Sequence, residues 1–194
     1  MRLFFMLLVG VVMMTSCGES ETTPIGAFAD FPTGGLKEFY DDNENLVKVR
    51  VFNNEGAVLE EGDYAYGVKE GSWITYHPNG FVKTTISYVN GLKQGLSVEL
   101  DNRGQLLESS TFHNNVLHGS YVKYNRSRIK EKKQYSNGVL HGLTEIFYDN
   151  GEIMEESIYE NGKREGIAKW YDQEGNLSIE YTYVNGEWIK DEEN

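Results

Sequence analysis

Apolar and polar residues alternate in short segments along most of this chain, and turns rich in glycine and asparagine separate the segments. Each unit ends on a glycine, at Gly71, Gly95, Gly119, Gly142 and Gly166, so that the spacings are 24, 24, 23 and 24 residues. A period of roughly 20 to 50 residues indicates a repeat architecture. The chain is therefore expected to be built from copies of one small structural unit.

Large side chains fill three columns of this repeat. The first lies five residues after the closing glycine and holds Phe52, Tyr76, Leu100, Tyr124, Phe147 and Tyr171. The second holds Val58, Val82, Leu106, Ile129, Ile153 and Leu177, and the third holds Tyr64, Tyr88, Phe112, Tyr135, Tyr159 and Tyr183. Segments of five and eight residues between turns suit strands and are too short for helices.

The loop inside each unit predicts a β-hairpin and its register. Pro78, Asn79 and Gly80 suit a three-residue loop that ends on a left-handed residue, which pairs Tyr76 with Val82. The fourth unit is one residue shorter and lacks the glycine. A two-residue loop at 126–127 would still pair Tyr124 with Ile129, but we expect this hairpin to be the least regular. The register of the turns that join the units stays open.

These observations predict an all-β protein: an elongated, twisted, single antiparallel meander of stacked β-hairpins with about 13 strands. The repeat domain covers residues 35–190 and comprises one partial unit, at 35–52, and six units of about 24 residues. A short acidic tail, 191–194, follows it.

The sequence motif Tyr-x-Asn-Gly-x-x-x-Gly, which occurs at 88–95, 135–142 and 159–166, resembles the MORN repeat. It is most similar to the bacterial variant found in antitoxin-like and lipoprotein members. The second glycine of the eukaryotic form, soon after the closing one, is missing here. The resemblance implies stacked β-hairpins and a scaffolding or protein-binding role, and it implies no catalytic residue.

The N-terminus has a different character. Arg2 precedes twelve apolar or small residues, 3–14, which are too few to span ~30 Å of hydrocarbon as a helix. Residues 1–17 are typical of a secretory signal, and the sequence before Cys17 resembles a bacterial lipobox, in which that cysteine is lipidated. A plain signal peptide and an uncleaved anchor are the alternatives. Residues 18–34 are expected to be a flexible linker.

Composition narrows the function classes. The net charge of −12 argues against a sequence-independent grip on nucleic acid and against docking on anionic lipid, so the N-terminal lipid is the expected membrane contact. No cofactor is expected. His118 and His141 share a column about 10 Å apart, too far for one metal ion, and we expect no metal site. No nucleophile with a base and an orienting group can be assembled.

Two groups of residues are candidate binding surfaces. Trp73, Tyr121 and Trp170 should lie opposite the face that carries Tyr76; they form an exposed aromatic stripe unless coiling of the sheet buries them. Arg128, Lys130 and Lys132 alternate and are expected to share one strand face. They either offer an electrostatic site for an acidic partner or glycan or neutralise a neighbouring acidic row at Glu152 and Glu156.

The expected function is a non-enzymatic, lipid-anchored module on the periplasmic or cell-surface side of a bacterial membrane. It would bind a partner protein or an envelope polymer, neither of which the sequence names. The alternatives are a passive structural spacer in the envelope, a hydrolase acting on envelope polymers, and an antitoxin-like protein, the last through the family resemblance alone.

Overall fold

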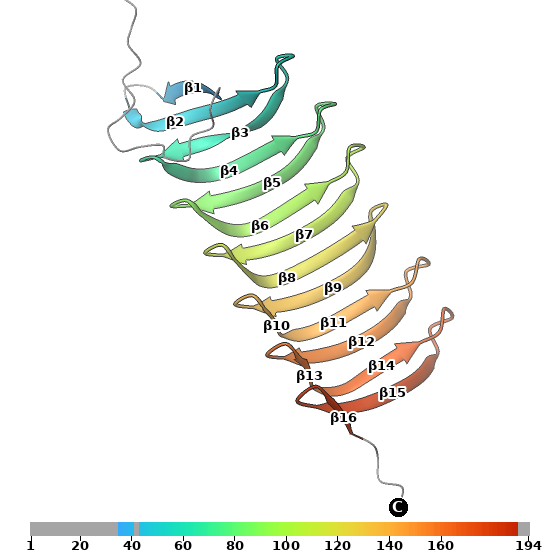
Figure 1. The fold of residues 1–194 in the computed structure, drawn as a ribbon. Coiled ribbons are helices and arrows are strands. Elements are labelled where there is room, and N and C mark those ends of the chain that lie inside the picture. Colours follow the sequence, from blue (N-terminus) through green and yellow to red (C-terminus); the bar gives the residue numbers. More distant parts are fainter. Residues whose placement is uncertain (1–34, 41–42, 190–194) are drawn as a thin grey trace, which may run out of the picture.

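The structure is a computed structural model that describes residues 35–40 and 43–189. Within this part of the chain there is one antiparallel sheet of 16 strands and no helix (Figure 1). The strands are β1 (Gly35–Tyr40), β2 (Asn43–Phe52), β3 (Val58–Ala65), β4 (Val68–Tyr76), β5 (Val82–Val89), β6 (Leu92–Leu100), β7 (Leu106–His113), β8 (Val116–Asn125), β9 (Arg128–Ser136), β10 (Val139–Leu140), β11 (Gly142–Phe147), β12 (Ile153–Glu160), β13 (Lys163–Arg164), β14 (Gly166–Tyr171), β15 (Leu177–Val184) and β16 (Glu187–Ile189).

Apart from two short segments, the strands are ordered in the sheet as they are in the sequence. The strands stack like the rungs of a ladder from β1 at one end to β16 at the other (Figure 1). β10 and β13 are short segments that pair with β9 and β12, and each is followed after one residue by β11 or β14. The predicted open meander of stacked hairpins is therefore confirmed. The signal segment 1–17, the linker 18–34 and the tail 191–194 lie outside the described residues.

The hairpin loops have the predicted registers. Tyr76 pairs with Val82, and Tyr124 pairs with Ile129 across the shortened loop. In the first of these hairpins the His77 N–H donates to the Phe81 carbonyl at 2.8 Å, and the loop glycine has a φ of 85°. The two strands of the shortened hairpin are paired from the loop to the closing glycine, like those of other hairpins. Its irregularity lies in the backbone, because Arg126 and Ser127 take φ values of 51° and 60° although neither is glycine or asparagine.

The turns that join the units stack on one another. Gly91 follows Asn90 in a two-residue turn and donates its N–H to the Lys69 carbonyl of the preceding unit at 2.9 Å. A Cβ on Gly91 would lie 3.3 Å from the Val68 Cβ, so close stacking as well as a φ of 77° favours glycine here. The equivalent bonds to preceding-unit carbonyls are made by Asn115, Gly138, Gly162 and Gly186.

Each closing glycine lies in a bulge, which settles the register that the sequence left open. Ile86 faces Ser97 and Tyr88 faces Lys93, so the strand that contains Gly95 has two more residues than its neighbour between these pairs. Bulges bend a strand and increase its twist. The strands are accordingly curved along their length (Figure 1).

Curvature lets a single layer bury side chains on one face, which we call the inner face. The buried side chains are Val47, Val49, Tyr64, Trp73, Ser110, Thr144, Glu155, Ser157 and Ala168. The main apolar cluster is at the N-terminal end, where Val47, Val49, Tyr64 and Trp73 pack together. Further along, serine, threonine and alanine occupy the corresponding row. The opposite, outer face carries Tyr76 and the rest of the first aromatic column.

Candidate functional site

A column of carboxylates runs along the inner face, and each carboxylate has a donor on the same face. Glu60 accepts from Lys69 Nζ at 2.8 Å, and Glu108 accepts from the Tyr121 hydroxyl at 3.0 Å. Glu131 forms an ion pair with Lys133 Nζ at 2.6 Å. The fourth member, Glu155, is the most elaborate of the set. Glu108, Glu131 and Glu155 lie one unit apart, and Glu60 lies two units before Glu108 in the same column.

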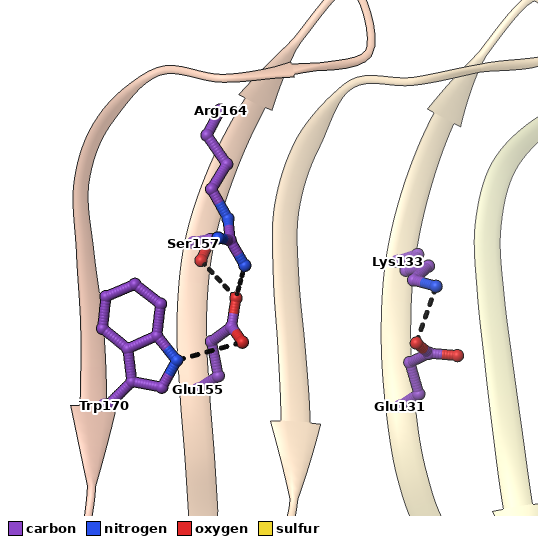
Figure 2. Close-up of polar contacts among 6 residues, drawn as sticks. All are labelled: Glu131, Lys133, Glu155, Ser157, Arg164 and Trp170. Atoms are coloured by element: carbon purple, nitrogen blue, oxygen red, sulfur yellow. Dashed lines mark hydrogen bonds and ion pairs between the residues drawn. The ribbon is translucent and has the colours of Figure 1, made fainter. Parts of the chain in front are cut away.

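Glu155 is buried, and three side chains surround its carboxylate (Figure 2). Ser157 Oγ donates to Oε1 at 2.8 Å, Arg164 Nη2 donates to the same oxygen, and Trp170 Nε1 donates to Oε2 at 3.1 Å. Burial opposes the positive charge of Arg164, but Glu155 and Tyr159 outweigh it and hold the Arg164 pKa above its usual value. Since both oxygens of the buried carboxylate accept hydrogen bonds, the cluster joins β12, β13 and β14 and has a structural role.

The predicted aromatic stripe belongs to this packed face. Trp73 is only 2% exposed, and it lies edge-on to Tyr64 at 5.2 Å between ring centroids, with Lys69 Nζ 3.7 Å from its own ring centroid. Tyr121 and Trp170 are partly buried, and their polar atoms are bound to glutamates. Of the two alternatives that the sequence left open, burial by curvature of the sheet is the one observed for Trp73.

Hydrogen bonding and burial also shift tyrosine ionisation on both faces. On the outer face Tyr76 donates to Glu61 Oε1 at 2.6 Å, and this bond raises the pKa of Tyr76 to about 12. The same bond is the main cause of the lowered pKa of Glu61. On the inner face, burial first and the bond to Glu108 second raise the pKa of Tyr121 to about 12.

The basic residues of β9 are divided between different partners. Ile129 faces Tyr124 and Glu131 faces Lys123, so Lys130 is an extra residue in a bulge that interrupts the alternation. The predicted common face for Arg128, Lys130 and Lys132 is therefore wrong. Lys130 pairs with Asp149 in the next loop, and Lys132 pairs with Glu145 at 3.3 Å. The neutralisation alternative is observed for Lys130 and Lys132, with these acids in place of Glu152 and Glu156.

The histidine column has a structural role at one joint. His118 Nδ1 accepts the Asn137 N–H of the next turn at 3.2 Å, and its ring lies 6.0 Å from that of His113. The residue before the closing glycine plays the same part in other units, where Glu70, Gln94 and Glu165 accept from Asn90, Asn114 and Asn185. This shared capping role explains the placement of a polar side chain before the closing glycine.

The outer face carries an apolar patch that sequence reasoning missed. Leu143, Ile158 and Ile167 are 40%, 48% and 50% exposed, and they come from the adjacent strands β11, β12 and β14. Together with Glu156 and Lys169 they border a hollow of about 300 Å³. We call these three apolar residues the outer patch. The sequence did contain a signal for this patch, because each of the three apolar residues stands at a position where a strand with one solvent-exposed face should have a polar residue.

Other chemistry is not apparent in residues 35–40 and 43–189. No group of three or more histidine, cysteine or acidic side chains there could hold a metal ion. Nor does this part of the chain contain a helix with the length and apolar character needed to cross a membrane.

Fold and site together define a repeat protein of stacked β-hairpins. Three segments, 69–90, 140–161 and 164–185, match the model of a family described as MORN repeat variant. The resemblance seen in the sequence is thus confirmed at three repeats, and repeats of this kind suggest a binding or scaffold module. No curated protein matches the chain.

Solved structures also match parts of the chain. A crystal structure of TarM matches with 15% identity and a TM-score of 0.34, over 50% of this chain and 19% of that chain. A TarM mutant from S. aureus, in complex with Fondaparinux, alpha-GlcNAc-glycerol and UDP, matches with 10% identity and a TM-score of 0.26, over 81% and 21%. The chain spans about a fifth of the length of these proteins, and neither likeness bears on its function.

Proposed function

We propose that this chain is a non-catalytic binding module of the bacterial cell envelope, anchored by a lipid on Cys17, whose sheet recognises a partner protein. The observation that carries the proposal is the outer patch. Three large apolar side chains, each at least 40% exposed, meet there around one hollow. A contiguous exposed apolar patch with a polar rim is typical of a protein-binding surface.

The shape and chemistry of the outer patch favour a protein partner that inserts an apolar side chain. The hollow of about 300 Å³ has room for one large side chain, and the lining leucine and isoleucines offer it no hydrogen bonds. Glu156 and Lys169 lie at the rim, where they can orient a polar backbone without being buried.

The test is co-purification from native membranes with a triple variant, Leu143→Ser, Ile158→Thr and Ile167→Thr. Leu96 provides a matched control, because it lies in the same repeat column as Leu143 and is 58% exposed, but pairs with Thr111. A partner should be recovered with the wild-type chain and the Leu96→Ser variant and be lost with the triple variant. Equal recovery with all three chains would refute the outer patch as the docking site.

The anchoring step has its own test, because Cys17 lies outside the described residues. The support for it is the apolar segment that precedes a lone cysteine in the sequence. A Cys17→Ser variant should lose incorporation of labelled fatty acid and appear in the soluble fraction. Retention of the variant in the membrane at the wild-type level would contradict anchoring through a lipid on this cysteine.

A passive spacer is the second candidate, and the hydrogen bonds between units favour it. Loops and turns are bonded to their neighbours on both edges of the sheet, as from Asn79 Nδ2 to the Asn102 carbonyl at 2.6 Å and from Gly91 N–H to the Lys69 carbonyl at 2.9 Å. A spacer should keep its function in the triple variant and lose it when whole units are deleted. A binding module should fail in the triple variant.

A further inference from the structure

The loop edge of the sheet is regular except at one place. Five hairpin loops contain a glycine with positive φ, at Gly56, Gly80, Gly104, Gly151 and Gly175. Neighbouring loops touch through asparagine side chains, as in the bond from Asn150 Nδ2 to the Gln173 carbonyl at 2.8 Å. The fourth loop is the exception, because it is one residue shorter and has no glycine.

The shortened loop holds its backbone in a conformation that its residues disfavour. Arg126 and Ser127 both lie in the left-handed region, with φ values of 51° and 60°. Side chains with a Cβ rarely adopt this region unless they are asparagine or aspartate. A strained backbone that persists is a feature of binding and catalytic sites. The other loops of this edge avoid the strain with glycine.

The shortening also opens a hollow of about 330 Å³ beside the next loop. Asn125, Arg126, Arg128 and Asp149 line it. Arg128 Nη1 donates to the Asp149 carbonyl at 2.9 Å, which fixes one side of its guanidinium and leaves the other available. The hollow is therefore flanked by two guanidinium groups at the open edge of the sheet.

The charges around the hollow do not cancel. Lys130 pairs with the Asp149 carboxylate, and their hydrogen bond is the main cause of the lowered pKa of Asp149, to which Arg128 and Arg126 contribute less. One carboxylate therefore stands among three basic side chains. Among the described residues, no carboxylate forms an ion pair with Arg126 or Arg128. Two uncompensated positive charges thus stand together in a protein whose net charge is −12.

We propose that this shortened loop is a binding site for an oxyanion of the phosphate class, held between the guanidinium groups of Arg126 and Arg128. Arginine presents paired N–H donors in a planar fork that matches two oxygens of a phosphate group. The rest of the acidic surface repels such ligands, so binding is confined to this place. The inference does not depend on the outer patch, which lies on different strands.

The experiment titrates inorganic pyrophosphate into the full chain by isothermal titration calorimetry. An Arg126→Asn, Arg128→Gln double variant should weaken binding at least about tenfold, because it removes charge-assisted hydrogen bonds. The matched control is Arg103→Gln, an exposed arginine in the preceding loop, which has a glycine. That variant should bind as the wild type does. Binding that is absent in the wild type, or unchanged in the double variant, overturns the proposal.

Two further measurements are needed. One identifies the source of the phosphate group, and the other distinguishes a binding role of Arg126 from a structural one. Vesicles of phosphatidylcholine with and without phosphatidic acid distinguish a lipid headgroup from a soluble phosphate, since only a headgroup site gives phosphatidic-acid-dependent binding that the double variant loses. Asparagine tolerates the left-handed region, so Arg126→Asn should leave the melting temperature unchanged or raised while binding weakens. A lowered melting temperature with unchanged pyrophosphate affinity would assign Arg126 to the fold and overturn the proposal.

Discussion

Replacing Gly62 by alanine tests the packing that underlies the inner face. Gly62 lies on β3 beneath the indole of Trp73, and a Cβ built there would be 2.4, 2.5 and 2.7 Å from the ring atoms Cδ2, Cε2 and Cγ. Carbon atoms in favourable contact are about 3.5 to 4.0 Å apart, so the ring has to retreat by about 1 Å. The glycine has no positive φ, so the cost of the alanine is steric alone.

The indole has little room to retreat. It packs edge-on against Tyr64 and Tyr88, with ring centroids 5.2 and 6.4 Å away, and Nε1 donates to the Asp63 carbonyl at 3.0 Å. Overpacking of this kind costs about 1–3 kcal/mol, and loss of the indole hydrogen bond adds about 1 kcal/mol. Alanine also lowers the conformational entropy of the unfolded chain, which stabilises the fold by about 0.4–1 kcal/mol. The net loss of stability is about 1–3.5 kcal/mol.

Urea unfolding followed by circular dichroism measures this loss, which corresponds to a fall in melting temperature of about 2–14 °C for a domain of this size. A Trp73→Leu background should reduce the cost of Gly62→Ala, because the clashing ring is gone. Ser110→Ala, in the same repeat column, adds no atoms and serves as the control. An effect of Gly62→Ala below about 0.5 kcal/mol, or one undiminished in the leucine background, would refute the steric account.

Three further outcomes can be measured on the same chain. The Tyr76 pKa is raised to about 12 in the folded state, so stability should fall as pH rises from about 10 through 12, and Tyr76→Phe should flatten that slope in alkaline denaturation. Glu155→Ala should destabilise the chain by about 2–4 kcal/mol in urea, because it leaves the paired guanidinium without its carboxylate; a loss below about 1 kcal/mol would contradict this. His118→Gln should keep the joint intact, as Gln94 does in its unit, whereas His118→Ala should cost about 1 kcal/mol and speed local hydrogen exchange at Asn137. Equal exchange in the two histidine variants would contradict a capping role.

The hairpins could be predicted from sequence because their registers depend on local chemistry. A three-residue loop that ends in glycine fixes the pairing of Tyr76 with Val82, and removing one residue preserves the pairing of Tyr124 with Ile129. These constraints involve residues a few positions apart. The all-β meander follows by repetition of the same rule.

The burial of each face could not be predicted in the same way. Alternation assigns Trp73 to the face opposite Tyr76, but only the bulge at each closing glycine bends the sheet enough to bury it. A second bulge at Lys130 redirects the basic side chains to Asp149 and Glu145. The position of each bulge depends on how the strand pairs with its neighbour. The sequence of a single strand does not carry this information.

The stacked turns have a consequence for how such a molecule changes its dimensions. Each unit adds two strands at about 4.8 Å each, so gain or loss of one unit moves the ends of the protein by about 10 Å. Because every unit bonds chiefly to the one before and the one after it, an internal duplication can be accommodated without redesign of the remainder. The length of the protein can therefore change in fixed steps, and the size of each step is the distance between successive Asn-Gly turns.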